Sequence, residues 1–319
     1  MRQIFRKVLV TGGAGFIGSH LVDALVEQGC AVNVLDDLSS GNFANIAHHR
    51  KSIDFQQGDI RDLDTLRRMA AGCDVIFHQA AVVSVPQTVA DPVGSASVND
   101  TGTLMVLEAA RQASVKRVVL ASSCAVYGDD PEIPKHEQMQ VKPQSPYAVQ
   151  KFTNELYAKL YAELYGLATV CLRYFNVFGP RQDPSSPYSG VISIFMTRAA
   201  ASMRPVIYGD GSQYRDFVFV KDVVQANLKA AAADQVDGEV LNVGTGRFIR
   251  IQDLWRRTAA MAGVDLAPEY APQRKGDILE SVADIRKASH RLGFKPVYAF
   301  ADGLRITYDW YRGSVMGNE

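Results

Sequence analysis

Val8-Leu9-Val10-Thr11-Gly12-Gly13-Ala14-Gly15-Phe16-Ile17-Gly18 is an apolar run that leads through glycines into a helical pattern. Gly12, Gly15 and Gly18 have the spacing GxxGxxG. Glycine permits a tight turn and lets a pyrophosphate approach the backbone, where a helix N-terminus offers N–H groups and a positive dipole end. The stretch predicts a strand, a phosphate-binding turn and a helix. Taken alone, the same glycines could simply reverse the chain.

Acidic residues at the end of the next apolar run support nucleotide binding. Asp36 and Asp37 follow Leu35, about 20 residues beyond the glycines, where an acid can hold the adenosine ribose hydroxyls and repel a 2′-phosphate. The pattern therefore favours NAD over NADP. Asp59 follows the third run and either bonds the adenine edge or is an ordinary turn aspartate.

The first half of the chain alternates short apolar runs with longer helical patterns, which is typical of parallel βαβ units. This rhythm predicts a doubly wound α/β sheet of the Rossmann type, with ligands at the carboxyl ends of its strands. The expected strands are Lys7–Val10, Ala31–Leu35, Ile53–Gln56, Asp74–Phe77, Arg117–Leu120 and Ala168–Arg173, and the expected helices are about 15–28, 62–71, 99–113 and 146–165.

The alternation breaks near Asn176, which suggests a second, smaller α/β lobe for substrate. We expect an NAD-binding domain at 1–175 and a substrate-binding lobe at 176–319, with part of 220–247 returning to the first domain. Within the lobe we expect helices near 191–201 and 222–233, a turn at 209–211 and a strand at 240–243.

Composition excludes several classes of protein. The 319 residues are 47% hydrophobic and 21% charged, with a net charge of zero, so a general nucleic-acid binder is not expected. No apolar run reaches the roughly 18 residues of a membrane span, and the N-terminus has no signal-peptide profile. The four cysteines form no CxxC pair and no ligand spacing with histidine, so we expect no metal site, no disulfides and a cytoplasmic location.

A second pattern supplies groups for proton transfer. Tyr147 and Lys151 are four residues apart in a predicted helix that Ser145 can cap and Pro146 can begin, so they share a face. A neighbouring ammonium and a positively charged nicotinamide would both lower the tyrosine pKa from about 10. Ser122 and Ser123 end the fifth strand, where a hydroxyl can bond the oxygen that Tyr147 deprotonates.

Together these motifs resemble the extended short-chain dehydrogenases/reductases, and more narrowly their UDP-hexose 4-epimerase branch. The resemblance runs from about Lys7 to Tyr311 and rests on TGGAGFIG, Asp36, SSCAVYG, the PYA-x-x-K motif that ends at Lys151, and RYFN at 173–176. It implies that Tyr147 is the base on the sugar 4-hydroxyl, that Ser123 assists and that Lys151 tunes it. The sugar would pass through a 4-keto form on tightly held NAD and receive its hydrogen back on the other face.

The resemblance also implies the residues around each ligand. The NAD site would comprise Gly12, Gly15, Phe16, Ile17, Gly18, Asp36, Asp37, Asp59, Ile60, Ala80, Asn99, Ser122, Tyr147, Lys151 and Tyr174. The substrate site would comprise Ser84, Ser123, Tyr147, Asn176, Arg215, Arg274, Asp277 and Ser281. Arg215 and Arg274 would contact the diphosphate and Asp277 the UDP ribose, because an arginine fork bonds phosphate oxygens in pairs.

Ser281 bears on the choice of sugar. In the epimerases that this chain resembles, the corresponding residue borders the sugar's 2-substituent, and a small side chain leaves room for an N-acetyl group. Ser281 therefore favours UDP-N-acetylglucosamine and UDP-N-acetylgalactosamine, alongside the plain hexoses.

Three alternatives stay open at this stage. A UDP-glucuronate decarboxylase or another sugar-nucleotide oxidoreductase shares the Tyr/Lys pair, and a non-catalytic NAD-binding sensor could keep the fold. A 4,6-dehydratase is disfavoured because Cys124-Ala125 stands where those enzymes carry an Asp-Glu pair. The resemblance further implies a homodimer, formed through the helices at 99–113 and 146–165.

Overall fold

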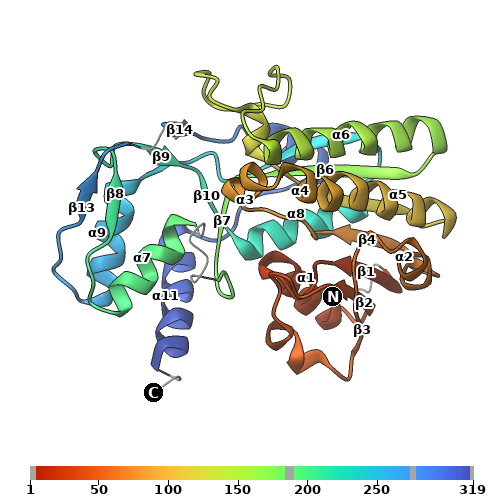
Figure 1. The fold of residues 1–319 in the computed structure, drawn as a ribbon, viewed down its shortest axis with the longest axis horizontal. Coiled ribbons are helices and arrows are strands. Elements are labelled where there is room, and N and C mark those ends of the chain that lie inside the picture. The colour runs from red at the N-terminus through yellow and green to blue at the C-terminus, as the bar shows by residue number, and fades with distance from the viewer. Residues whose placement is uncertain (1–4, 184–189, 274–277, 317–319) are drawn as a thin grey trace.

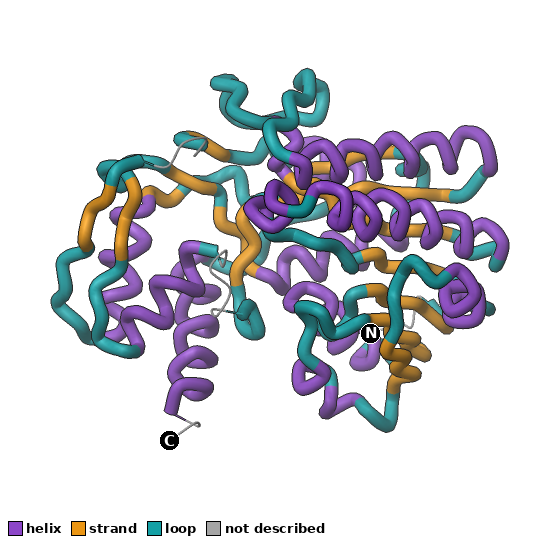
Figure 2. Tube along the Cα trace, viewed as in Figure 1, coloured by secondary structure: helices purple, strands orange, loops and turns teal. Residues whose placement is uncertain are grey.

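The central element is a seven-stranded parallel sheet in the order β11-β6-β5-β4-β1-β2-β3 (Figures 1 and 2). The computed structural model describes residues 5–183, 190–273 and 278–316, with side chains as far as Gly313. The strands are β1 (Lys7–Thr11), β2 (Ala31–Asp36), β3 (Ile53–Gln57), β4 (Val75–His78), β5 (Arg117–Ser123), β6 (Ala168–Tyr174) and β11 (Glu239–Val243). The predicted Rossmann-type architecture is confirmed.

Alternating side chains of the strands divide the core into two layers, as period-two strands require. Val8 and Val10 of β1 face α1, α8 and α10, whereas Leu9 faces α2, α5 and α6. These helices are α1 (Phe16–Glu27), α2 (Leu63–Ala70), α5 (Thr103–Gln112), α6 (Pro146–Tyr165), α8 (Val220–Ala232) and α10 (Arg286–Leu292). Because both faces are covered, the central strands β1, β4, β5 and β6 are mostly apolar and buried, whereas the edge strand β3 is more polar.

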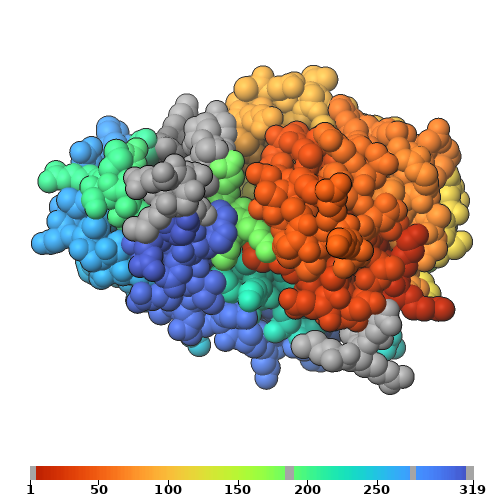
Figure 3. Space-filling view, turned by 90° about the horizontal axis from the view of Figure 1, so that it is seen from below, coloured from red at the N-terminus to blue at the C-terminus, as the bar shows by residue number. Residues whose placement is uncertain are grey.

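The second lobe has its own core, in which α7, α9 and α11 pack together (Figure 1). Its helices are α7 (Val191–Ala200), α9 (Ile251–Ala262) and α11 (Phe300–Met316). Small sheets edge it: β7 (Asn176–Phe178) with β10 (Phe217–Phe219), β8 (Val206–Tyr208) with β13 (Glu269–Ala271), and β9 (Tyr214–Arg215) between β12 (Ile249–Arg250) and β14 (Glu280–Ser281). In the space-filling view this lobe forms the green-to-blue side of the molecule, opposite the red and orange N-terminal part (Figure 3).

Late segments of the chain lie against the first part. β11 pairs with β6 in parallel register, and α8 packs on α1. The segment of α10 also joins this core through Ala288, Leu292 and Phe294, which the sequence analysis did not anticipate.

The helix expected at 99–113 has a different form. A π-helical stretch, Ser97–Gly102, precedes α5 and buries Asn99. Two short helices, α3 (Val85–Ala90) and α4 (Pro92–Ala96), lead into it. Within the described residues, no helix combines the length and apolar character needed to cross a bilayer.

Candidate active site

The turn after β1 requires glycine at two positions. Gly12 has a φ of +69°, and a Cβ there would lie 2.6 Å from the backbone nitrogen of Ala80. A Cβ on Gly18 would collide with the carbonyl oxygen of Gly12. Gly15, the N-cap residue before α1, has no side chain to cap the helix, so the first N–H groups of α1 can bond a phosphate.

Asp36 is buried at the end of β2 and faces this turn. Its carboxylate accepts hydrogen bonds from the backbone N–H of Ala14 and of Leu38, both at 2.9 Å. Burial raises the pKa of Asp36, and these bonds oppose the shift. Asp37 is exposed instead and accepts from the backbone and hydroxyl of Ser39. Of the two predicted acids, Asp36 is therefore the one that the turn orients.

Asp59 and Ile60 both contact other parts of the protein in this structure. The Asp59 carboxylate accepts from the backbone and guanidinium of Arg61, and this hydrogen bonding lowers the pKa of Asp59. Ile60 is 5% exposed and lies against Gly102. Asp59 is paired within its turn, which agrees with the alternative interpretation of the sequence, and its contact with the adenine edge stays a prediction.

The segment after β4 borders the same edge of the sheet. Ala80 touches Gly12, and Asn99 bonds both the N–H and the carbonyl of Val82, at 2.8 and 2.9 Å. Ser84 accepts from the N–H of Gln87 and so caps α3. Phe16 and Ile17, half-buried in the first turn of α1, pack against the core of the second lobe.

Ser123, Tyr147 and Lys151 come together at the carboxyl end of β5. Ser145 accepts from the N–H of Ala148 and caps α6 as expected, which places Tyr147 in its first turn. Tyr147 and Ser123 are hydrogen-bonded through their hydroxyls. Lys151 is 5% exposed; its ammonium lies 5.8 Å from the centre of the Tyr147 ring and donates to the carbonyl of Ala121 at 2.9 Å.

Burial shifts the pKa of both side chains in the direction of their neutral forms. Burial raises the pKa of Tyr147 to about 12, although the bond to Ser123 opposes this. Burial also lowers the pKa of Lys151 to about 8, against the attraction of Cys171, Asp100 and Glu155. The expected lowering of the tyrosine pKa does not come from these residues, because desolvation by burial is the largest cause of the shift.

Ser122 and Tyr174 direct their hydroxyls into buried networks. Ser122 donates to Glu155 at 2.5 Å, and Glu155 forms a two-pronged ion pair with Arg173 at 2.7 and 2.8 Å. The Tyr174 hydroxyl bonds Asn227 and lies 3.3 Å from Gln79. As placed here, these hydroxyls position the ends of β5 and β6, and only other atoms of the two residues are left for a ligand.

The second lobe brings substrate candidates to the same edge. Ser281 on β14 pairs in register with Arg215 on β9, and it also hydrogen-bonds the thiol of Cys124, the neighbour of Ser123. The Arg215 guanidinium donates to the carbonyls of Tyr214 and Leu279. Asn176 donates to the carbonyl of Asp216. Arg274 and Asp277 lie outside the described residues.

Asp216 is a positioning residue that the sequence analysis missed. It is fully buried, and its carboxylate accepts from Thr245 through both N–H and hydroxyl, from Gly246 and from Ala283. It therefore ties the end of β9, which carries Arg215, to residues 245–246 and to the chain just after Ser281. The YRDF motif places Asp216 next to Arg215, but it does not reveal these partners, because they are far away along the chain.

Comparisons with known proteins agree with this site. Residues 8–244 match the NAD dependent epimerase/dehydratase family. The chain is 42% identical over 310 residues to the UDP-glucose 4-epimerase of Mycolicibacterium smegmatis, covering 96% of this chain and 98% of the relative. It is also 32% identical to a UDP-N-acetyl-alpha-D-glucosaminuronate decarboxylase of Bacillus cytotoxicus, over 96% of this chain and 98% of that protein.

Solved structures are similar over almost their whole length. The UDP-N-acetylglucosamine 4-epimerase of Methanobrevibacter ruminantium, in complex with UDP-N-acetylmuramic acid, superposes with a TM-score of 0.94 at 40% identity, covering 98% of this chain and all of that one. The UDP-glucose 4-epimerase of Thermotoga maritima, with UDP-glucose, gives 0.92 at 39% identity, covering 97% and 99%. This protein belongs to the NAD-dependent epimerase/dehydratase family, and its cofactor is NAD.

Proposed function

We propose that the protein is an isomerase that interconverts UDP-sugars at C4, with UDP-N-acetylglucosamine and UDP-N-acetylgalactosamine as its pair and UDP-glucose and UDP-galactose as further substrates. The observation that carries this proposal is the convergence of Ser123, Tyr147 and Lys151 beside the glycine turn. The similarity to 4-epimerases of UDP-glucose and UDP-N-acetylglucosamine supports it.

The residues present fit NAD. The glycines of the turn allow a backbone approach to the pyrophosphate, the N-terminus of α1 offers N–H donors, and Asp36 is oriented for the adenosine ribose. Ala80 and Asn99 would border the nicotinamide half. When bound, NAD⁺ supplies an acceptor for the hydrogen on C4 and a positive charge beside the Tyr147 phenol.

Tyr147 removes the proton of the 4-hydroxyl, and Ser123 holds the sugar oxygen by a hydrogen bond. The phenolate that this step needs would be favoured by the positive charge of bound NAD⁺ together with the Lys151 ammonium, which lies 5.8 Å from the ring centre. After the 4-keto sugar turns, Tyr147 returns the proton to its 4-oxygen. C4 receives the hydrogen that it gave to the cofactor back on the other face of the ring, and the opposite configuration results.

The substrate would extend from this site across the second lobe. Arg215 reaches the carbonyl of Leu279, which lines a cavity of about 370 Å³ together with Tyr208, Gly209, Asp210, Ser212, Gln213 and Gln273. We assign this side to the UDP group, with Asn176, Arg274 and Asp277 as further contacts. Ser281 then lies near the sugar, because it touches Cys124, and its small side chain accommodates a 2-acetamido group.

The alternative function is a UDP-uronate decarboxylase. The similarity to the Bacillus cytotoxicus decarboxylase supports this alternative. That reaction would release CO2, whereas epimerisation conserves every atom of the substrate.

The same proposal includes a cytoplasmic homodimer. The four cysteines are free thiols, as expected in a reducing compartment. The exposed face of α6 carries Val149, Leu156, Leu160 and Leu164 at helical spacing, between 44% and 67% exposed. A second copy covering this stripe would bury it.

The deciding experiment is NMR of the purified protein with UDP-N-acetylglucosamine and no added NAD, with UDP-glucose in a parallel sample. Formation of UDP-N-acetylgalactosamine supports the full proposal. Conversion of UDP-glucose alone keeps the mechanism and rejects the role of Ser281. If neither changes after NAD is supplied while a UDP-uronate loses CO2, the decarboxylase is correct.

A further inference from the structure

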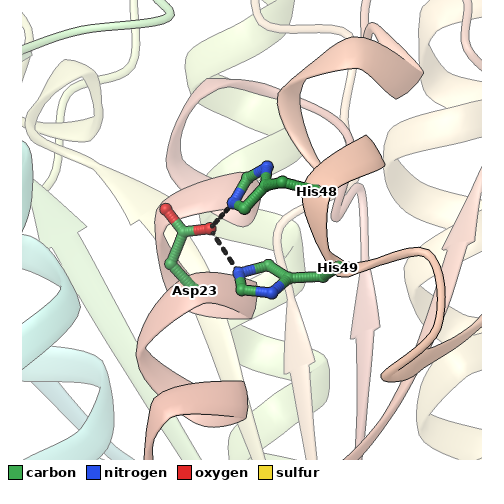
Figure 4. A group of neighbouring side chains, drawn as sticks. All are labelled: Asp23, His48 and His49. Atoms are coloured by element: carbon green, nitrogen blue, oxygen red, sulfur yellow. Dashed lines mark hydrogen bonds and ion pairs between the residues drawn. The ribbon is translucent and has the colours of Figure 1, made fainter.

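Three potential metal ligands converge outside the residues assigned to NAD and substrate, between α1 and the 3₁₀ turn Ala47–His49 (Figure 4). Nε2 of His48 and Nε2 of His49 each lie 3.0 Å from Oδ1 of Asp23. The three ligand atoms lie within 4.8 Å of one another. We propose that Asp23, His48 and His49 bind a zinc ion.

The convergence of the two histidines is the first argument. Neighbouring residues in a 3₁₀ turn point about 120° apart around its axis. His48 and His49 nevertheless turn both rings to one carboxylate oxygen, with ring centres 4.1 Å apart. Tetrahedral zinc with bonds of about 2.0–2.1 Å holds its ligand atoms about 3.3 Å apart. Small movements of these side chains are enough to reach that geometry.

The way in which Asp23 is held is the second argument. Arg181 forms an ion pair with Oδ2 of Asp23 at 2.8 Å, which leaves Oδ1 to face the histidines. Both imidazole Nε2 atoms lie 3.0 Å from that oxygen, so the three ligand atoms are already gathered on one side of the carboxylate.

The donor set favours zinc over calcium and magnesium. Two imidazole nitrogens and one carboxylate oxygen suit zinc, whereas calcium and magnesium prefer all-oxygen sites. The His48 side chain is 50% exposed, so the ion can enter from solvent and take water as its fourth ligand.

A zinc ion at this site would stabilise the folded chain. The segment between β2 and the histidines is already tied to the glycine turn, because Asn42 and Asn45 both donate to the carbonyl of Ala14. A metal bond from that segment to α1 would close a second link between the two. An ion that binds only the folded chain also raises the melting temperature.

The test uses untagged full-length protein, treated with EDTA and desalted, then titrated with Zn²⁺ by calorimetry and with Co²⁺ by visible absorption. We expect one strong site per chain, a tetrahedral cobalt spectrum and a rise in Tm with zinc. Asp23→Asn, His49→Gln and His48→Gln should each weaken binding at least about tenfold and remove the Tm rise. His136→Gln is the matched control, because His136 contacts a single carboxylate, Glu132, at 2.8 Å.

Equal zinc affinity in the wild type and the three ligand variants would overturn the proposal, as would a loss in His136→Gln as large as theirs. A zinc dissociation constant above about 0.1 mM, which means far weaker binding than at structural zinc sites, would do the same. His48→Gln decides the question if circular dichroism shows that Asp23→Asn fails to fold, because the half-exposed His48 supports little of the core. The sequence did not predict this site because its third ligand comes from another element.

Discussion

Tyr147 is the side chain on which the proposed chemistry depends, because its hydroxyl is bonded to Ser123 and lies in the first turn of α6. Phenylalanine at this position keeps the ring and removes the proton carrier. We expect Tyr147→Phe to lower kcat about 10²–10⁴-fold while NAD stays bound. NMR turnover and the NAD content of the purified protein measure both effects. Tyr165→Phe, at an exposed position of the same helix, is the control and should keep normal turnover. Near-normal turnover by Tyr147→Phe would refute the role of Tyr147 as the base.

Ser281 is the residue that should set the sugar range. It is 7% exposed and bonds Cys124, so a larger side chain must occupy space beside Ser123. Ser281→Tyr should reduce kcat/KM for UDP-N-acetylglucosamine at least about tenfold and spare UDP-glucose, a difference within reach of steric exclusion. Ser281→Ala should keep both activities. An equal loss of both sugars in Ser281→Tyr would mean that the residue supports the lobe and does not select the substrate.

At the scale of elements, the glycine turn tests the link between backbone packing and NAD binding. A methyl group on Gly18 meets the carbonyl oxygen of Gly12, so α1 must move away from the turn. Gly18→Ala should lower the free energy of unfolding by more than about 1 kcal/mol and release NAD. Gly313→Ala meets nothing within 4 Å and lies in α11, so it should be neutral or stabilise by up to about 1 kcal/mol. Denaturant titration and NAD content compare the two, and equal behaviour would contradict the steric account.

The apolar stripe of α6 tests the proposed assembly. Leu160 and Leu164 are 44% and 67% exposed and lie on one face of the helix. The double variant Leu160→Glu/Leu164→Glu should convert a dimer into monomers, because burying two carboxylates in an apolar interface is unfavourable. Light scattering after size exclusion gives the molar mass. Val297→Glu is the control, because Val297 is as exposed as Leu164 but lies outside α6, and this variant should stay dimeric. If the wild-type protein is a monomer, the proposed dimer is wrong.

At the scale of the whole molecule, a buried histidine couples stability to pH. His78 on β4 is hydrogen-bonded between Thr11 of β1 and Thr103 of α5, and burial lowers its pKa from 6.5 to about 3. Burial likewise lowers the pKa of His20 to about 4. Between these values and pH 6.5 the unfolded chain binds more protons than the folded one, so stability falls as pH falls.

Each such histidine contributes a slope of at most about 1.4 kcal/mol per pH unit in that window. His78→Asn should therefore flatten the dependence of the unfolding free energy on pH between pH 6.5 and 4, whatever its effect at pH 7. Urea titrations across that range provide the measurement. The same slope in both proteins would show that His78 does not titrate on unfolding.

Local patterns were sufficient for much of the fold. Short apolar runs predicted six strands of the main sheet, because strands buried on both faces leave a continuous apolar signal. Five of the six agree to within one residue at each end, and β5 extends three residues beyond its predicted end. The Ser145-Pro146 signal predicted the start of α6, since helix caps depend on adjacent residues. The spacing of Tyr147 and Lys151 predicted a shared helix face, and the structure has their side chains adjacent.

Contacts between distant segments could not be predicted in the same way. The sequence does not reveal that Ser122 bonds Glu155, that Asp216 gathers Thr245, Gly246 and Ala283, or that α10 packs on the main sheet. The sign of the tyrosine pKa shift also depended on tertiary structure, because desolvation is set by everything that packs around the hydroxyl.

The sequence by itself determined the sheet architecture and the glycine turn after β1, and it was enough to predict Ser123, Tyr147 and Lys151 as proton-transfer residues. Each of these features depends on residues that are close together along the chain. Only the tertiary structure decided that Ser281 meets Cys124 beside Ser123, and that Asp23 of α1 meets His48 and His49. Those meetings depend on how separately formed elements pack, and the free energy of packing is shared among many side chains that no local pattern encodes.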